Sequence, residues 1–281
     1  MLKQRVITAL LLLAILLPAL FYPSPTPFFI VMLAMVGAAG WEWGRMHQYG
    51  QGWSLFLGGE CVALCLLSWW LGLLGHSSPL LWSAAGAAWV LGGAALLRAG
   101  VAGWPRVPRA VRITGGVLAL WVAWLAICQA RVLGINFLLS VLLLVWTADI
   151  FAYFVGRAFG SRFTKTKLAA SISPGKSWEG VWGGMAGVIL LAIGWVWADA
   201  VFQASGASLY TRLADRGWWM LLLGVVFLAA MSVVGDLVES LVKRSVGVKD
   251  SSALLPGHGG VLDRVDALLP AVPLAMMLVS L

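Results

Sequence analysis

Long apolar stretches recur along nearly the whole chain, separated by short segments that contain glycine, proline or charge. A bilayer core about 30 Å thick is crossed by a helix of about 20 mainly apolar residues. The sequence therefore predicts an all-α, polytopic integral membrane protein with about nine transmembrane helices. Their expected bounds are 6–22, 27–44, 53–74, 79–97, 113–130, 137–159, 180–198, 218–237 and 265–281.

Composition excludes several other classes of protein. Of the 281 residues, 61% are hydrophobic and 11% are charged, whereas soluble domains carry roughly 25% charged residues. A soluble enzyme and a disordered chain are excluded on this ground, and three cysteines within apolar runs do not form a disulfide scaffold. The net charge of +8 lacks the water-facing basic patch of a nucleic-acid-binding protein, so we expect membrane lipids and no nucleic acid as partners.

The distribution of basic residues predicts the orientation. Short loops rich in lysine and arginine stay in the cytoplasm. With a cytoplasmic N-terminus and nine spans, only Arg131, Arg212 and Arg216 of the 19 basic residues lie outside. Both long polar segments, 160–179 and 238–266, are then cytoplasmic. We expect a bacterial inner (cytoplasmic) membrane protein whose chemistry faces the cytoplasm.

The chain divides into two predicted regions. Residues 1–135 are expected to form a scaffold of transmembrane helices with lipid and oligomer contacts. Residues 136–281 are expected to form the catalytic transmembrane region, because they contain both polar segments.

Polar residues near the end of the eighth predicted span share one helical face. Asp236, Glu239, Ser240 and Lys243 follow the spacing i, i+3, i+4 and i+7. This places two carboxylates, a hydroxyl and a cation at the membrane or its edge. The simpler alternative is a helix end with solvated charges.

Further carboxylates follow within forty residues. Asp263 and Asp266 are spaced i, i+3 at the start of the last span, where the helix dipole alone would stabilise them. Together with Asp236 and Asp250, they form a set of oxygen ligands that suits a hard cation such as Mg²⁺. Carboxylates among several cations are typical of a metal–triphosphate site.

A second polar stretch begins inside the sixth predicted span. Asp149, Tyr153, Gly156 and Gly160 lie along one helical face, and an acidic residue at that depth indicates a functional site. The basic, hydroxyl-rich loop that follows is suited to phosphate binding, or only orients the protein. Its Gly-Lys-Ser sequence is no P-loop, because Ala170 stands where the upstream glycine is required.

The run from 240 to 266 resembles the signature of the phosphatidate cytidylyltransferases, also called CDP-diacylglycerol synthases. The matching positions are Ser240-x-x-Lys243-Arg244, Lys249-Asp250, Leu255-Pro256-x-His258-Gly259-Gly260 and Asp263-Arg264-x-Asp266. A second conserved region of the family is similar to Asp149-x-x-Ala152-Tyr153-x-x-Gly156 and Ser173-Pro174-x-Lys176-Ser177-x-Glu179-Gly180. The resemblance covers roughly the C-terminal half, and the chain departs from the family pattern at Ser161, Gly175 and Ser177.

This resemblance implies transfer of a cytidylyl group from CTP to phosphatidic acid for phospholipid biosynthesis, giving CDP-diacylglycerol and pyrophosphate. It implies Mg²⁺ as the cofactor, leaves room for a second, monovalent ion, and suggests a homodimer. By analogy, Asp236, Asp263 and Asp266 are the metal ligands. The catalytic set that it implies is Lys243, Arg244, Lys249, Asp250, His258 and Arg264, and the substrate-binding set is Asp149, Tyr153, Ser173, Lys176, Glu179, Ser240, Gly259 and Gly260.

Two other functions are compatible with parts of the pattern. The membrane carboxylates Glu60, Asp149 and Asp236 would suit a cation-coupled transporter, although the acidic groups gather in the C-terminal half without the repeated halves of many transporters. A CTP-dependent polyprenol kinase would share a nucleotide site. In a cytidylyltransferase, the acyl chains of the lipid acceptor lie in hydrocarbon and CTP is in water. This hypothesis therefore predicts a polar cavity that opens both to the cytoplasm and to lipid.

Overall fold

The computed structural model of the chain describes residues 2–280 and consists of helices joined by loops. Within this range there is no β-strand, only an isolated bridge between Leu255 and Gly259. Helices satisfy every interior backbone group without water, which is the requirement inside a bilayer. The predicted all-α fold is confirmed.

The N-terminal half contains six α-helices. These are α1 (Leu2–Phe21), α2 (Thr26–Met46), α3 (Gln51–Trp70), α4 (Pro79–Ala87), α5 (Gly93–Ala99) and α6 (Arg109–Leu133). A π-helical turn, η2 (Ala88–Gly92), joins α4 to α5, so the three form one continuous helical segment. Short 3₁₀ turns, η1 (Leu73–Gly75) and η3 (Trp104–Arg106), lie on either side of that segment.

The C-terminal half contains the remaining six. These are α7 (Ile135–Phe159), α8 (Trp178–Val201), α9 (Leu209–Ala214), α10 (Trp218–Ser245), α11 (Leu262–Val265) and α12 (Leu268–Ser280). Across the described residues, eight segments are long and apolar enough to cross a membrane: α1, α2, α3, the α4–α5 segment, α6, α7, α8 and α10. They correspond to the first eight predicted spans.

The ninth predicted span, 265–281, differs from the expectation. Its helix α12 has 13 residues, which is about 20 Å at 1.5 Å per residue and short of the bilayer core. Most of its side chains are buried, because it packs against α4, α6 and α10. The apolar residues of α12 therefore form a helix that is enclosed by protein and not one that is surrounded by lipid.

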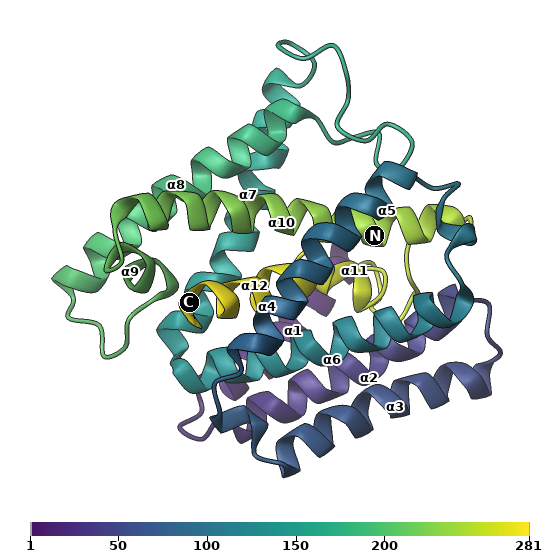
Figure 1. Cartoon of the computed structure of the whole chain (residues 1–281), viewed down its shortest axis with the longest axis horizontal. Coiled ribbons are helices and arrows are strands. Elements are labelled where there is room, and N and C mark those ends of the chain that lie inside the picture. The colour runs from purple at the N-terminus through teal and green to yellow at the C-terminus, as the bar shows by residue number, and fades with distance from the viewer. Residues whose placement is uncertain (1, 281) are drawn as a thin grey trace.

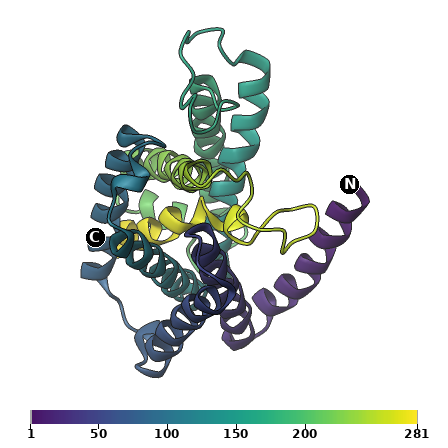
Figure 2. The ribbon, with the colours of Figure 1, turned by 90° about the vertical axis from the view of Figure 1, so that its right-hand side faces the viewer.

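The helices form two groups around α10 and α12. Helices α2, α3 and α6 pack on one another in the lower part of Figure 1, while α10 runs across the middle of the molecule. Helices α7 and α8 pack together (Figure 1), and the 160–177 loop between them returns to α10, where Arg244 Nε donates to the Ile172 carbonyl at 3.4 Å. In the turned view α1 leans away from the other helices, and the loop between α10 and α11 reaches toward it (Figure 2), where Thr8 Oγ1 donates to the Pro256 carbonyl at 2.9 Å.

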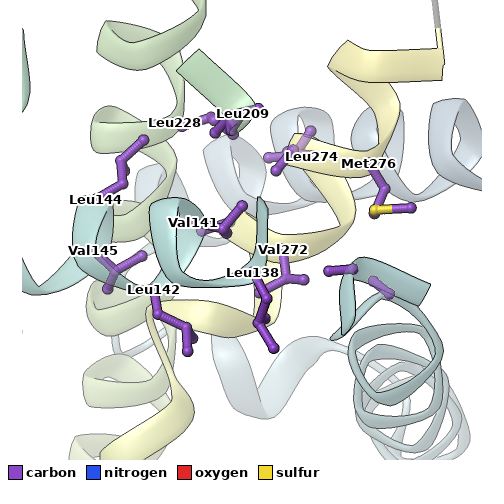
Figure 3. Close-up of a cluster of buried hydrophobic side chains, with 14 of the residues drawn as sticks. Leu138, Val141, Leu142, Leu144, Val145, Leu209, Leu228, Val272, Leu274 and Met276 are labelled. Atoms are coloured by element: carbon purple, nitrogen blue, oxygen red, sulfur yellow. The ribbon is translucent and has the colours of Figure 1, made fainter. Parts of the chain in front are cut away.

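The main hydrophobic core lies where α7, α9, α10 and α12 meet. Figure 3 shows leucine and valine side chains from α7 facing Leu209, Leu228 and Leu274 of the other three helices. All three of these leucines are fully buried. This core holds α10 in place relative to α7, which determines the position of the polar side chains that both helices carry.

Close packing of α8 on α7 brings the start of α8 against the residues of the sixth predicted span. A Cβ added at Gly180 would lie 2.8 Å from the Ala152 carbonyl oxygen, and one at Gly184 would lie 2.8 Å from that of Ala148. Only glycine allows the backbones to approach so closely. As a result, the start of α8 lies directly beside the polar face of α7.

Candidate active site

A polar cavity of about 510 Å³ lies between α7, α10 and the start of α8. Two acidic and two basic side chains line it together with small residues, which leave its space unfilled. The lining residues are Asp149, Ala152, Tyr153, Gly156, Arg157, Gly175, Lys176, Ser177, Gly180, Val181, Val233 and Asp236. The structure thus brings Asp236 of the eighth predicted span together with residues of the sixth span and of the loop that follows it.

Asp236 and Lys176 form an ion pair across this cavity. Lys176 Nζ lies 2.6 Å from Asp236 Oδ2, and Ser240 Oγ donates to Asp236 Oδ1 at 3.3 Å. Lys176 directly precedes Ser177, the N-cap of α8, whose hydroxyl accepts from the Gly180 N–H at 3.2 Å. The positive end of the helix dipole and the lysine therefore face the cavity together.

The α7 wall supplies the other polar groups. Asp149 and Tyr153 are one turn apart, as their spacing predicts, and Arg157 Nη1 donates to the Tyr153 hydroxyl at 3.0 Å. Two carboxylates and two cations alternate around a space of this size. Such a lining is suited to a ligand with several anionic oxygens and a bound cation.

A second charged cluster lies further along α10. Lys243 Nζ is 2.5 Å from Glu239 Oε2 and 2.5 Å from Asp263 Oδ1. The side chains of Lys243, Glu239 and Asp263 are 10%, 5% and 4% exposed. Because Lys243 and Asp236 share a face of α10 two turns apart, the two clusters are separated by about 10 Å along the helix axis.

Asp263 is held by donors from the preceding loop as well as by Lys243. Its Oδ2 accepts from the backbone N–H groups of Ser251 (2.9 Å) and Gly260 (2.7 Å) and from the Ser251 hydroxyl (2.8 Å). Burial opposes the charge on Asp263, but the hydrogen bonds from Lys243 and the loop outweigh it, so its carboxyl pKa lies below the ordinary value. Asp263 is therefore an ionised carboxylate at neutral pH.

Asp266 lies against α10 beside Asp236. A Cβ added at Gly235 would overlap the Asp266 carbonyl oxygen, and Asp266 Oδ1 accepts from the Ala267 N–H at 2.7 Å. Of the three predicted metal ligands, Asp236 therefore lies in α10, and Asp263 and Asp266, at α11, both contact α10. In the described part of the chain they do not converge, however, since no three acidic, histidine or cysteine groups lie close enough to hold one ion.

The chemistry of these carboxylates fits Mg²⁺ all the same. Mg²⁺ usually takes one or two protein carboxylates, with waters and substrate phosphates completing its coordination. Asp236 Oδ2 and Asp263 Oδ1 each have a lysine ammonium as their cationic neighbour, which shows that both atoms attract a cation. The two lysines are also the groups that would contact phosphates.

Four predicted residues lie on the exposed surface around the second cluster: Arg244, Lys249, Asp250 and Arg264. Arg244 Nη1 donates to the Val248 carbonyl at 3.2 Å. His258 lies in the turn before Gly259, and its buried Nδ1 has no hydrogen-bond partner among the described residues. Gly259 and Gly260 frame Asp263 directly, since a Cβ at Gly259 would lie 2.8 Å from Asp263 Oδ2.

Ser173 and Glu179 shape the loop before α8 and do not line the polar cavity. Glu179 is 2% exposed, and its Oε1 accepts from the N–H groups of Phe163 (3.0 Å) and Thr164 (2.8 Å). The Ser173 carbonyl accepts from the Lys176 N–H at 3.2 Å. Their predicted contacts with substrate stay predictions, while here Glu179 holds residues 163–164 and Ser173 forms a turn with Lys176.

Two acidic residues at the site were not among the predicted site residues. Glu239 shares the polar face of α10 but was not assigned a role. Glu42 of α2 is fully buried and contacts the loop before α11. A glutamate within an otherwise apolar span is the signal that could have identified Glu42.

An apolar cleft of about 580 Å³ also reaches α10. It lies between the α4–α5 segment and α6, and its lining includes the π-helical residues Ala88 and Trp89. At its inner wall it meets Gly235 and Glu239, whereas the polar cavity meets Val233 and Asp236. The two spaces therefore flank α10 on neighbouring faces, since Glu239 is about 60° around the helix from Asp236.

The fold and these sites describe a polytopic membrane protein with charged residues between a polar cavity and an apolar cleft. Residues 3–281 match the Cytidylyltransferase family. The chain belongs to that family.

Named relatives agree with this assignment. The chain is similar to a phosphatidate cytidylyltransferase of Pseudomonas aeruginosa, with 40% identity over 97% of this chain and 95% of the relative. It is also similar to a phosphatidate cytidylyltransferase of Haemophilus influenzae, with 37% identity over 97% and 96% of the two chains. A phosphatidate cytidylyltransferase of Brucella abortus is 44% identical over 46% of this chain and 42% of its own.

Proposed function

We propose that this protein transfers a cytidylyl group from CTP to phosphatidic acid, forming CDP-diacylglycerol and pyrophosphate. Two relatives named for this activity match nearly the full chain. The observation that carries the proposal is the position of the polar cavity and the apolar cleft on neighbouring faces of α10. A reaction between a water-soluble nucleotide and a lipid requires such a pair of spaces.

CTP is assigned to the polar cavity. Lys176, Arg157 and the N-terminus of α8 provide positive potential for the triphosphate. Asp149 and Asp236 face the same space and would balance a bound cation. The cavity volume of about 510 Å³ lies within the range of ordinary small-molecule sites.

Phosphatidic acid is assigned to the apolar cleft. Apart from Arg112 and Glu239, the cleft is lined by residues such as Leu81, Ala84 and Leu118 that suit acyl chains. Its inner wall includes Glu239, which pairs with Lys243. A lipid phosphate at that end would lie beside the cationic group of Lys243.

We assign one cation, Mg²⁺, to Asp236 with Asp266 as a further ligand, and the second ion to Asp263, because the two clusters are about 10 Å apart along α10. When bound, these ions would offset phosphate charge, and Mg²⁺ would polarise the P–O bonds. Lys176 and Lys243, which contact these carboxylates, would then be released to hold phosphate oxygens. Arg244, Lys249 and Arg264 lie at the exposed rim, where they would attract the nucleotide.

The transfer needs no protein nucleophile. An oxygen of the phosphatidate phosphate attacks the α-phosphorus of CTP, the new P–O bond forms, and the bond to the β-phosphate oxygen breaks to release pyrophosphate. The protein's contribution is to align the two phosphates and neutralise their charge. We further propose that the site faces the cytoplasm of a bacterial inner membrane and that the enzyme is a homodimer.

The test uses purified protein in detergent with phosphatidic acid, Mg²⁺ and CTP labelled either in cytidine or in the γ-phosphate. The proposal requires cytidine label in the lipid and release of pyrophosphate. Label from the γ-phosphate in the lipid would indicate a kinase instead, and no labelled lipid would contradict both. Asp236→Asn should reduce turnover at least about 100-fold, whereas Asp215→Asn, at the end of α9 and before α10 begins, should not.

A further inference from the structure

Glu42 is a carboxylate enclosed within the protein. It lies in α2, four residues before that helix ends, and its side chain has no exposed surface. A buried carboxylate is costly unless donors surround it. The donors that surround Glu42 all belong to one distant segment, residues 251–262.

Four hydrogen bonds join Glu42 to that segment. Its Oε1 accepts from the Ser252 hydroxyl at 2.6 Å and from the Val261 N–H at 2.9 Å. Its Oε2 accepts from the Leu262 N–H at 2.8 Å and from the Ser251 hydroxyl at 3.1 Å. Both carboxylate oxygens are thus used to hold the turn that begins α11.

The same segment holds Asp263. The Ser251 hydroxyl lies within hydrogen-bond distance of Glu42 Oε2 and of Asp263 Oδ2. Gly260 donates its N–H to Asp263, while the next residue, Val261, donates to Glu42. A Cβ at Gly260 would overlap both the Ser251 hydroxyl and Glu42 Oε1. Glu42 and Asp263 therefore divide the donors of one tightly packed turn.

We propose that Glu42 is a positioning residue for the transfer reaction, acting from the N-terminal half of the chain. By fixing residues 251–262, it sets the place of Asp263 and, through the 2.5 Å ion pair, of Lys243. This inference rests on the proposed function, which gives those two residues their roles. Because Glu42 does not line the polar cavity, it should govern turnover more than binding of CTP.

The decisive variant is Glu42→Gln, which keeps the size of the side chain but directs an NH₂ group at N–H and O–H donors. Its matched control is Glu60→Gln, the same change at an exposed position of neighbouring α3. Glu42→Gln should lower kcat by about 30-fold, equivalent to about 2 kcal/mol. KM for CTP should change by less than about threefold, because uniform binding is retained. Glu42→Asp, which keeps the charge, should recover part of the loss, and Glu60→Gln should match the unsubstituted enzyme.

A second readout separates positioning from simple loss of folded protein. The stoichiometry of CTP binding, measured by calorimetry on the full chain in detergent, gives the fraction of intact sites. The inference requires that kcat per intact site falls. It is overturned if kcat is unchanged, or if the fall in activity equals the fall in CTP-binding sites.

A milder variant covers the case in which Glu42→Gln does not fold. Ser252→Ala removes only the 2.6 Å donor and should lower kcat per intact site severalfold, while an unchanged kcat overturns the inference. If the unsubstituted enzyme and Glu60→Gln form no CDP-diacylglycerol, the proposed function fails and this inference fails with it. If both are active and Glu42→Gln equals them, the inference alone fails.

Discussion

Replacing Lys243 by methionine should destabilise the protein. Second substitutions at its two carboxylate partners should then show which of them relies more on the charge of Lys243. Methionine keeps most of the side-chain length but leaves Glu239 and Asp263, which are 5% and 4% exposed, without their shared cation. Breaking a buried ion pair by removing one partner costs about 3–5 kcal/mol. We expect a loss in that range in the free energy of unfolding.

The loss should come mainly from Glu239. Asp263 keeps three donors from Ser251 and Gly260, whereas Glu239 has no partner other than Lys243 among the described residues. Adding Glu239→Gln to Lys243→Met should therefore restore more than half of the lost stability. Adding Asp263→Asn should restore little, because it disrupts the loop donors as well.

These stabilities can be measured by SDS titration in mixed micelles, followed by the fluorescence of the 17 tryptophans. Lys165→Met, at an exposed loop position, is the control and should change stability by less than about 0.5 kcal/mol. A loss below about 1 kcal/mol for Lys243→Met would refute the reasoning, given the 3–5 kcal/mol expected for a broken buried pair. So would a larger rescue by Asp263→Asn than by Glu239→Gln.

Three further predictions concern the loop, the metal and the lipid. Gly260→Ala should reduce both stability and turnover, because its Cβ would overlap the Ser251 hydroxyl. Gly194→Ala, which has open space around its Cβ, is the control and should change neither. Thermal unfolding measures the stability, and product formation measures the turnover. Removing divalent cations with EDTA should abolish transfer and Mg²⁺ should restore it, while activity that persists in EDTA would contradict the metal assignment. Ala88→Phe, which fills part of the apolar cleft, should raise KM for phosphatidic acid but not KM for CTP in a steady-state assay. Leu190→Phe, on the exposed side of α8, is the control and should change neither KM.

The positions of the eight membrane-length segments could be predicted, because each apolar run forms its helix from local backbone hydrogen bonds alone. Helix α12 shows the limit of this reasoning. Leu274 of α12 is fully buried in protein, while Leu190 of α8 is 66% exposed, yet both lie in similarly apolar runs. Hydropathy does not distinguish a lipid environment from a protein interior.

The same limit applies to the site. The ion pair of Asp236 with Lys176 joins two segments that the sequence had already marked as polar. Glu42, in contrast, lies in the apolar N-terminal half, and its partners are 209 to 220 residues away in the chain. No helical spacing relates such residues, so only the packing of α2 against the loop before α11 reveals their contact.

The polar cavity and the apolar cleft have no lining residue in common, although both reach α10. If phosphatidic acid occupies the cleft and CTP the cavity, as proposed, mutations that widen or shorten the cleft leave the nucleotide side chemically intact. Tail-length preference and base preference would then be separable traits. Engineering of unusual lipids should begin at the walls formed by α4, α5 and α6.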